Sequence, residues 1–503
     1  FLLIVTTLYA GQLVWRERDA RSAQLFDALP LPGWLAPLSK TLALVGMQAL
    51  LLALAMLAAM LCQVLRGYFA LEFGLYLRTF SIMLPQWAVL AVLSVTVMAL
   101  CSRKYAGYAL LVALHVAGMV TGGLGLDHVL LSGAIPPLPW SGMNGYGHLL
   151  QRERMLELYW GSLALMLLVL AVVLWPRGVN PEFGSRLRLA RQNLGRGVLA
   201  AFGIGLLLFG ASGALLWYEL DVAGNYTSTR AQDARRAEYE TRYRHFAALL
   251  QPRLMEVALR VDLHPRTRML AVSGSYQLQN AGAAPLSELV VYQRPGADLV
   301  ARLSQPARLL DADRARGFYR YRLDTPLAPG ARLAYDFQLS AAPAGPLGFG
   351  TDTPVAANGS WLTDEDLPRI GYQEAVELSD ERDRRRHGLG PRARPAATSA
   401  AAAGGQRIRF EALVTTSVDQ IAVAPGALER EWIAGERRHF RYRAEQPILA
   451  RYAIASARYA VRHERWQDVA IDAFYQPGHE ANVERLVRGA SAALDYGTRA
   501  FGS

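Results

Sequence analysis

The stretch LALVGMQALLLALAMLAAMLCQV, residues Leu42–Val64, is apolar throughout except for Gln48 and Gln63. A helix rises about 1.5 Å per residue and the apolar core of a bilayer is about 30 Å thick, so about 20 such residues cross it. Main-chain groups that lack partners are too costly in lipid for other local structures. The stretch therefore predicts a membrane-spanning helix.

Five further apolar runs accompany this one, and the six together predict a membrane α-helical bundle over residues 1–217. His115 lies inside one run, and an ionisable side chain within a span is by default a functional hypothesis. A polar contact between helices is the structural alternative for this residue. The runs are Phe1–Val14, Ile82–Leu100 with a Pro85-Gln86 break near its start, Tyr108–Leu124, Tyr159–Trp175 and Val198–Trp217.

Basic residues alternate from loop to loop between these runs. The first, third and fifth loops carry eleven Lys and Arg residues, and the second and fourth carry four. Because loops rich in Lys and Arg stay in the cytoplasm, we expect the chain after Trp217 to lie in the periplasm of a bacterial inner membrane. The eleven are Arg16, Arg18, Arg21, Lys40, Arg103, Lys104, Arg177, Arg186, Arg188, Arg191 and Arg196, and the four are Arg66, Arg78, Arg152 and Arg154.

The fourth loop, Asp127–Glu157, is long and partly apolar. Its Pro136-Pro137-Leu138-Pro139-Trp140 sequence and Tyr146 would suit a segment at the membrane interface, where Trp and Tyr act as anchors. A packed outer loop is the simpler interpretation, and we prefer it.

The first loop opens with the charged segment Trp15–Pro30, which resembles the cytoplasmic helix that follows the second membrane helix of ABC exporter permeases. The resemblance covers about residues 1–217. It implies that a separate ATPase subunit docks on Arg16, Glu17, Arg18, Asp19, Arg21, Leu25 and Phe26. A solvated charge cluster that only enforces topology is the alternative.

An ATP site within the chain is not predicted. A phosphate-binding loop needs G-x-x-x-x-G-K-[ST], because its glycines let main-chain N–H groups approach the phosphates. Ser39-Lys40-Thr41 is the one candidate, and Ser39 and Trp34 stand where glycines are needed. ATP would therefore be bound by a partner.

After Trp217 the pattern changes to a charged helix followed by strands. Residues 218–253 form a connector, with Tyr239, Tyr243, Phe246 and Leu250 at helical spacing within Thr227–Leu250. Short alternating runs separated by turn residues then predict an antiparallel saddle or sandwich over 254–475, with a flexible loop at Gly388–Gly405. The expected strands are Met255–Leu263, Met269–Leu278, Leu289–Gln293, Phe318–Leu323, Leu333–Leu339, Ile408–Thr416, Ile421–Val423, Phe440–Arg443, Ile448–Ser456 and Val469–Phe474, and Asn482–Phe501 is an expected helix.

Several short motifs in this half resemble the N-terminal β-domain of zinc aminopeptidases related to aminopeptidase N, in the gluzincin family. The resemblance covers about 254–503 and implies that 476–503 begins an α/β catalytic-type domain. Both chain ends look like cuts in a longer protein, which we expect to be a fusion of a permease with this peptidase region, truncated before the zinc motif. The motifs are Asn358-Gly359-Ser360-Trp361, Leu367–Gln373, Ala424-Pro425-Gly426, Ser456–Tyr459 and Tyr475–His479.

The zinc motif of that family, H-E-x-x-H, does not occur. His463-Glu464 is followed by Gln467 where the second His belongs, and His479-Glu480 is followed by Val483. The two cysteines, Cys62 and Cys101, lie in or beside apolar runs. We therefore expect no catalytic residue, metal ligand or cofactor in this chain, and zinc only in a catalytic domain beyond it.

The leading functional hypothesis is thus an ABC-type permease of a bacterial inner membrane that carries a periplasmic, aminopeptidase-like β-domain. The alternatives are a sensory or binding membrane protein with a non-catalytic outer domain, and a peptidase that its helices merely anchor. Expected partners are the bilayer, a separate ATPase subunit and a second copy of the chain. Membrane topology explains part of the net charge of +11, and the sequence shows no nucleic-acid-binding module, so nucleic acid is not an expected partner.

Overall fold

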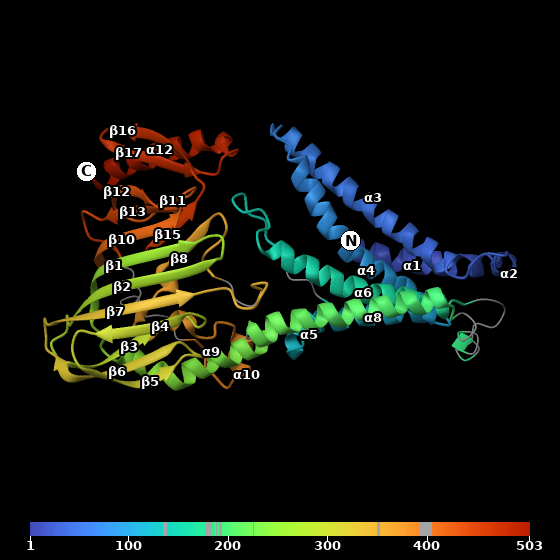
Figure 1. The fold of residues 1–503 in the computed structure, drawn as a ribbon, viewed down its shortest axis with the longest axis horizontal. Helices are drawn as coiled ribbons and strands as arrows, with labels where there is room; N and C mark the ends of the chain where they lie inside the picture. The colour runs from blue at the N-terminus through green and yellow to red at the C-terminus, as the bar shows by residue number, and fades with distance from the viewer. Residues whose placement is uncertain are drawn as a thin grey trace. The chain divides into compact units, whose positions relative to one another are not determined.

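The computed structural model describes residues 1–133, 138–176, 184, 186–187, 190, 194–224, 226–349, 353–392 and 405–502. It divides into two compact units: a helical unit, Phe1–Pro137 with Leu149–Tyr218, and a β unit, Leu138–His148 with Glu219–Ser503. Figure 1 shows helices in the first and mostly strands in the second. A helical N-terminal region followed by a β-rich region is thereby confirmed. The boundaries expected at 217, 253 and 475 stay predictions.

Five helices of the helical unit are long and apolar enough to cross a membrane, judged by length and composition among the described residues. The predicted membrane location and its sidedness stay predictions. The helices of this unit are α1 (Leu2–Asp19), α2 (Ala23–Asp27), α3 (Leu35–Leu65), α4 (Phe73–Leu100), α5 (Lys104–Leu124), α6 (Leu149–Val173) and α8 (Arg196–Trp217).

The expected span Phe1–Val14 is not among those five. It forms most of α1, whose 18 residues end in the charged run Arg16-Glu17-Arg18-Asp19. The apolar part that remains is shorter than the roughly 20 residues a straight crossing requires. Ala10 and Val14 of α1 are instead buried against Leu44 and Met98 of α3 and α4.

Two other expectations about the helices differ from the structure. α6 begins at Leu149, well before the expected Tyr159, so the polar residues Gln151–Glu157 are helical. α4 runs from Phe73 to Leu100 without a break at Pro85. Glu153 and Arg154 of α6 form hydrogen bonds with α4, and these contacts explain both differences.

The β unit is built on one large sheet whose path is β12-β13-β10-β1-β2-β7-β4, with β14 paired to β10. All neighbouring strands are antiparallel except β1 and β10, which run parallel. The strands are β1 (Arg253–His264), β2 (Met269–Gln279), β4 (Asp298–Leu303), β7 (Arg332–Ala341), β10 (Arg407–Ser417), β12 (Ala427–Ala434), β13 (Arg437–Arg443) and β14 (Ile448–Leu449).

Smaller sheets complete this unit. One follows the order β5-β6-β3-β9, another β11-β15-β8, and β16 pairs with β17 beside helix α12. Their bounds are β3 (Leu286–Tyr292), β5 (Ala307–Asp313), β6 (Phe318–Leu327), β8 (Ser360–Thr363), β9 (Arg369–Ile370), β11 (Ile421–Val423), β15 (Ala453–Ala457), β16 (Ala460–Trp466), β17 (Val469–Tyr475), α10 (Glu381–Arg386) and α12 (Val483–Phe501).

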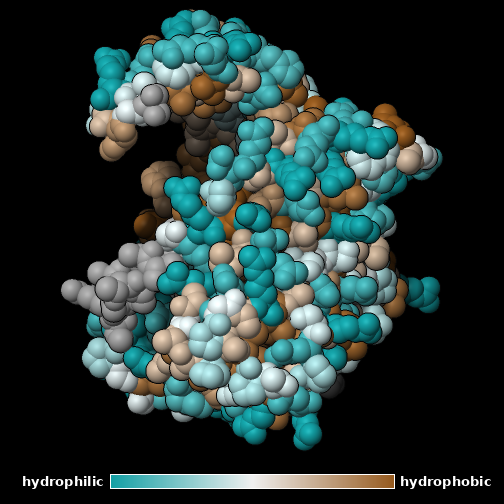
Figure 2. Space-filling view, turned by 90° about the vertical axis from the view of Figure 1, so that its left-hand side faces the viewer, coloured by the Kyte–Doolittle hydropathy of each residue, from teal (hydrophilic) through white to brown (hydrophobic). Residues whose placement is uncertain are grey.

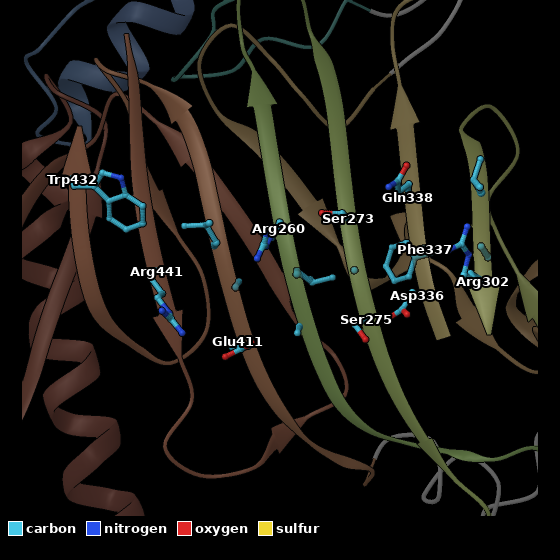
Figure 3. A pocket seen from close by; sticks show the side chains of 17 residues that line it. Arg260, Ser273, Ser275, Arg302, Asp336, Phe337, Gln338, Glu411, Trp432 and Arg441 are labelled. Atoms are coloured by element: carbon cyan, nitrogen blue, oxygen red, sulfur yellow. The ribbon is translucent and has the colours of Figure 1, made fainter. Parts of the chain in front are cut away.

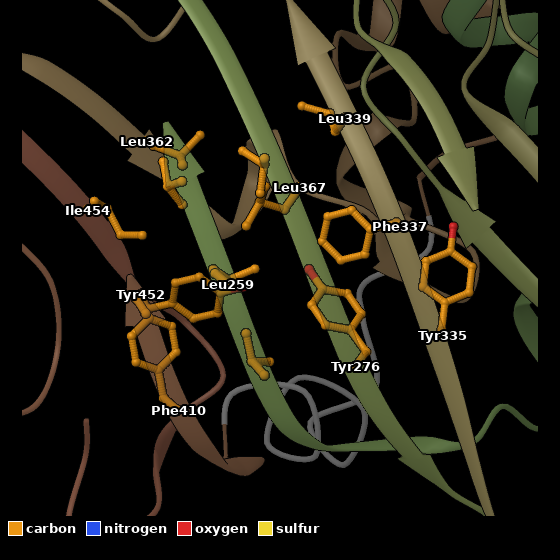
Figure 4. Close-up of a cluster of buried hydrophobic side chains, with 14 of the residues drawn as sticks. Leu259, Tyr276, Tyr335, Phe337, Leu339, Leu362, Leu367, Phe410, Tyr452 and Ile454 are labelled. Carbon is orange, nitrogen blue, oxygen red and sulfur yellow. The ribbon is translucent and has the colours of Figure 1, made fainter. Parts of the chain in front are cut away.

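One face of the large sheet covers the hydrophobic core of the β unit (Figure 4). Residues of β1 alternate, so that Leu259 faces the core with Tyr276 and Phe337 of the next strands. Gly274 lies opposite Phe337 in the strand register, and a Cβ there would stand 2.3 Å from the Phe337 ring. The close approach of that ring therefore requires glycine. Figure 2 shows one side of the molecule, where most of the surface residues are hydrophilic.

The expected connector helix is α9 (Thr229–Tyr243), and it packs on the β unit. Ser228 caps its first turn by accepting a hydrogen bond from the Ala231 N–H at 3.2 Å. The ring of Tyr243 stacks on Phe318 with centroids 3.8 Å apart, and Tyr239 stacks on Tyr372 at 5.0 Å. Burial in this cluster raises the pKa of Tyr239 and Tyr372.

Candidate functional site

The predicted ATPase-docking residues lie at the connection between α1 and α3. Arg16, Glu17, Arg18 and Asp19 form the last turn of α1, and Arg21 follows it with φ +55°. Leu25 and Phe26 belong to the short helix α2, which has no buried residue. The structure thus brings all seven residues into one segment, as their order in the sequence requires.

The acidic residues of this segment are engaged inside the helical unit. Lys40 of α3 donates to the Glu17 carboxylate at 2.6 Å and to the Leu13 carbonyl at 2.5 Å. Lys104, at the start of α5, donates to Asp19 at 2.6 Å. Because three helices are joined by these contacts, Glu17 and Asp19 hold the end of α1 in place. Sequence analysis did not identify their lysine partners.

The apolar residues of the segment are exposed instead. Leu25 is 75% exposed and Phe26 54%, and Leu29, Leu31 and Trp34 are each about half exposed. We call these five residues the α2 apolar surface. A cavity of about 280 Å³ lies beside it, lined among others by Phe26, Lys40 and Trp175. Exposed apolar side chains gathered in one short segment mark protein–protein or membrane interaction sites.

His115 does not gather a polar site around it. Its Nδ1 lies 2.5 Å from the Leu111 carbonyl one helical turn earlier in α5, and its Nε2 is buried without a partner among the described residues. A polar contact between helices, the structural alternative, is not seen either, because no side chain of another helix bonds to His115 among the described residues. The functional hypothesis for His115 stays a prediction.

Of the five arginines in the fifth loop, the structure describes Arg186 and Arg196. Arg177, Arg188 and Arg191 lie outside the described residues. Arg186 is buried and donates to the Ala99 carbonyl at 2.6 Å, at the end of α4. Arg186 therefore satisfies a carbonyl group at a helix C-terminus, and its role in topology stays a prediction.

A shallow groove crosses the solvent-facing side of the large sheet (Figure 3). Its volume is about 730 Å³, and small residues such as Ala258, Ser273 and Ser275 form its floor. The register aligns Arg260 with Ser273, and Ser273 with Gln338, across three strands. Arg260 and Arg302 make no ion pair within the described part of the chain. The charged side chains that line the groove are Arg260, Arg302, Asp336, Glu411 and Arg441.

One end of this groove carries an aromatic stack. The indole of Trp432 on β12 lies parallel to the His439 ring on β13, with centroids 5.0 Å apart. The guanidinium of Arg430 lies 5.0 Å from the Trp432 ring centroid. Thr415 Oγ1 lies 2.9 Å from His439 Nδ1. A groove with guanidinium groups and a flat aromatic wall suits a ligand with carboxylate or other anionic groups.

Asn358, from the first of the resemblance motifs, joins three segments of the β unit. Its Nδ2 donates to the Met143 carbonyl at 2.6 Å and to Gln476 Oε1 at 3.2 Å, and its Oδ1 accepts from the Arg458 N–H at 2.7 Å. Gly359 has φ +90°, and a Cβ there would stand 3.0 Å from Met143 Sδ. The α5–α6 loop is therefore packed at Leu138–His148, as preferred from the sequence. Its contact with Asn358 was not foreseen.

A zinc centre does not fit the His-Glu pairs. His463 lies on β16, where its Nδ1 is 2.7 Å from Asp472 of β17. Glu480 accepts the Gly478 N–H at 2.9 Å, and this hydrogen bond lowers the pKa of its carboxyl group, so Glu480 closes a turn. No three His, Cys, Asp or Glu side chains converge to hold a metal ion in the described ranges.

The sequence matches no known protein-family model and no curated protein. Solved structures with a similar arrangement include a two-domain M1 zinc metallopeptidase mutant bound to L-arginine. It is 14% identical, covers 50% of this chain and 54% of its own, and gives a TM-score of 0.33. The M1 zinc metallopeptidase from Deinococcus radiodurans is 14% identical over 47% of this chain and 52% of its own, at a TM-score of 0.31. This chain spans about half of each, and such values do not assign it to that family.

Proposed function

We propose that this chain is the membrane subunit of an ATP-driven transporter of a bacterial inner membrane, with its β unit in the periplasm. The α2 apolar surface carries the proposal, because Leu25 and Phe26 are exposed beside a turn that Lys40 and Lys104 hold in place. A separate ATPase subunit is the occupant that the sequence resemblance implies. The five apolar helices supply the membrane part.

Site-specific crosslinking tests the docking. A photoreactive side chain at Leu25 or Phe26 should capture an ATP-binding subunit in native membranes. The matched control is Phe69, which is 74% exposed between α3 and α4, in the loop that the proposal puts on the other side. Equal capture at Phe69 would contradict the proposal, as would ATP hydrolysis by the purified chain alone.

The proposed sidedness has its own test. Single cysteines replace Ser22 and Glu381 in a background that lacks Cys62 and Cys101. An impermeant thiol reagent should label the Glu381 position from outside intact cells and the Ser22 position only after the membrane is opened. Labelling of both from outside rejects the topology. Arg188 is also predicted on the inner side, but it lies outside the described residues, so Ser22 is used instead.

A second candidate function is a membrane-bound binding protein, favoured by the groove on the large sheet. Arg260 and Arg302 lie across its floor, and the Trp432 ring stands at one end. An anionic ligand would then bind to the β unit without an ATPase partner. Loss of ligand binding in Arg260→Ala, with unchanged crosslinking at Leu25, would favour this function over transport.

A peptidase-like role of the β unit, as a support for a zinc domain beyond Ser503, remains part of the proposed fusion. Zinc content separates this role from the others, because no set of zinc ligands converges among the described residues. We expect no stoichiometric zinc in this chain and one zinc ion in a chain extended past Ser503. One chelatable zinc per copy of this chain alone would contradict the proposal.

A further inference from the structure

Two carboxyl groups are buried inside the helical unit, one helical turn apart on α6. Glu153 is 2% exposed, and the side chain of Glu157 is 10% exposed. Residues four apart lie on the same face of a helix. Two ionised carboxylates buried in a candidate membrane span are costly unless they are paired, so a structural reason or a function must explain them.

The partners of the two carboxyl groups differ. Glu153 Oε1 accepts a hydrogen bond from the neutral amide of Gln86 at 2.7 Å, and Glu153 has no ion pair with any described residue. Glu157 Oε2 accepts from the guanidinium of Arg154 at 2.7 Å. Glu157 Oε1 is buried and has no partner within the described ranges. Among the described residues, Glu157 thus has an ion pair and an acceptor atom without a partner, and Glu153 has no ion pair.

The helices packed on α6 bring no further counter-ion. α8 carries Arg196 at its far end, and α3 carries Lys40, which already binds Glu17. α4 contributes Tyr76 and Arg78 besides Gln86, and α6 itself contributes Arg152 and Arg154. None of these except Arg154 forms an ion pair with Glu153 or Glu157, among the residues that the structure describes.

We propose that Glu153 and Glu157 form a proton-binding site of the helical unit. The neutral carboxyl group is the form of Glu153 that burial without an ion pair favours. Glu157 Oε1 is a second acceptor for a proton, because it is buried without a partner among the described residues.

A proton fits the site better than a metal ion. Ca²⁺ takes six to eight oxygen ligands and Mg²⁺ takes about six. Here two carboxyl groups and one amide converge, and Arg154 already repels a cation from Glu157. Protonation of Glu157 would weaken its pair with Arg154, whose guanidinium also donates to the Ser81 carbonyl of α4. The proton therefore reaches a contact between two helices.

Carbodiimide labelling tests the site in the full chain in native membranes. An apolar carbodiimide reacts with protonated carboxyl groups and leaves carboxylates unmodified. We expect an adduct on Glu153 at about pH 7, found by peptide mass spectrometry, that declines about tenfold per pH unit above the pKa of Glu153. The matched control is Glu72, exposed before α4, which should label only in acid.

Two variants separate a proton site from a purely structural contact. Gln86→Leu removes a donor that stabilises the Glu153 carboxylate, so the labelling midpoint should move to higher pH. Glu157→Gln removes a nearby negative charge, so the midpoint should move to lower pH. A Glu153 that stays unlabelled from about pH 5 to 8 in folded protein overturns the proposal, and so does a midpoint equal to that of Glu72. Protection by Na⁺ at constant pH and ionic strength would assign the site to a metal cation instead.

Discussion

Arg154 on α6 donates from Nη1 to the main-chain carbonyl of Ser81 on α4, at 3.2 Å. Pro85 lies four residues after Ser81 and has no N–H group, so this carbonyl lacks its partner in the helix. Nη2 of the same guanidinium lies 3.3 Å from Ser81 Oγ. A side chain from a second helix therefore replaces the missing donor, and α4 continues through a proline at which the sequence predicted a break.

This relationship predicts an energetic coupling between Arg154 and Pro85. Arg154→Leu should destabilise the protein because the Ser81 carbonyl then has no donor. In a Pro85→Ala background the new N–H serves that carbonyl, so the same substitution should cost less, by about 1 kcal/mol. Thermal unfolding of the two single variants and the double variant in detergent measures the coupling.

The control for this cycle is Arg78→Leu. Arg78 is an exposed arginine of α4 for which no ion pair is described. Its substitution should cost the same in both backgrounds. Additive effects of Arg154→Leu and Pro85→Ala would show that the two residues are independent.

A second buried contact holds the connector helix on the β unit. The Arg384 guanidinium donates to both oxygens of Glu240, at 2.7 and 2.8 Å, and both side chains are 1% exposed. Arg384 also donates to the carbonyls of Leu378 and Gly390. Hydrogen bonding to Glu240 raises the pKa of Arg384, so the guanidinium stays charged.

We expect Arg384→Leu to destabilise the β unit by about 3 kcal/mol, because it leaves the Glu240 carboxylate buried. Arg244 still reaches Glu240 at 2.9 Å, which keeps the loss at the lower end of the usual range. Hydrogen exchange of the α9 amides should accelerate accordingly. Arg385→Leu, at a side chain that is 68% exposed, should cost less than about 0.5 kcal/mol. Equal effects of the two substitutions would contradict the assignment.

The parts of the fold that the sequence predicted are those whose signal is local. Long apolar runs identified the five helices, and alternation identified β1, β2 and β7. β12, at the edge of the large sheet, was missed because seven of its eight residues are exposed, and β16 was missed because Arg462–Arg465 in its centre are all polar. The start of α6 was missed because Glu153 is buried only through its partner on α4.

In the candidate sites, too, residues with a local sequence signal were named from the sequence, and residues brought together by packing were not. Leu25 and Phe26 were singled out because Trp15–Pro30 resembles a permease segment, and their docking role stays a prediction. The lysines that hold this segment come from α3 and α5, and no sequence spacing relates Lys104 to Asp19. Asn358 was noted as part of a motif, but its contact with Met143 joins residues 215 positions apart. Such pairs follow from packing, which a single sequence does not encode locally.

Asn358 yields a prediction about the α5–α6 loop. Asn358→Ala removes the donor for the Met143 carbonyl and the acceptor for the Arg458 N–H, so Leu138–His148 should exchange amide hydrogens faster. Gly359→Ala should act similarly, because alanine is strained at φ +90° and meets the Met143 side chain. Hydrogen exchange with mass spectrometry reports on the loop peptide.

The matched control is Asn482→Ala, since the Asn482 side chain forms no capping hydrogen bond at α12. This variant should leave the exchange of the loop unchanged. Unchanged exchange in Asn358→Ala as well would mean that other contacts hold the loop.

The last prediction concerns alkaline pH. Tyr243 donates its hydroxyl hydrogen to Asp313 Oδ2 at 2.9 Å, and burial together with this carboxylate raises the pKa of Tyr243 to about 12. An unfolded tyrosine ionises near pH 10. Because the folded pKa is the higher one, the stabilising contribution of the neutral phenol is complete below about pH 10 and is lost as the pH rises through about 12.

Tyr243→Phe keeps the ring that stacks on Phe318 and removes the ionisable group. We expect the variant to unfold at lower temperature than the wild type at about pH 8, because the hydrogen bond to Asp313 is absent. The difference should shrink between about pH 10 and 12 and then reverse, since the wild type must place a phenolate beside a carboxylate while the variant does not. Unfolding temperatures across this range measure the effect. A difference that stays constant with pH would show that Tyr243 does not titrate differently in the folded and unfolded states.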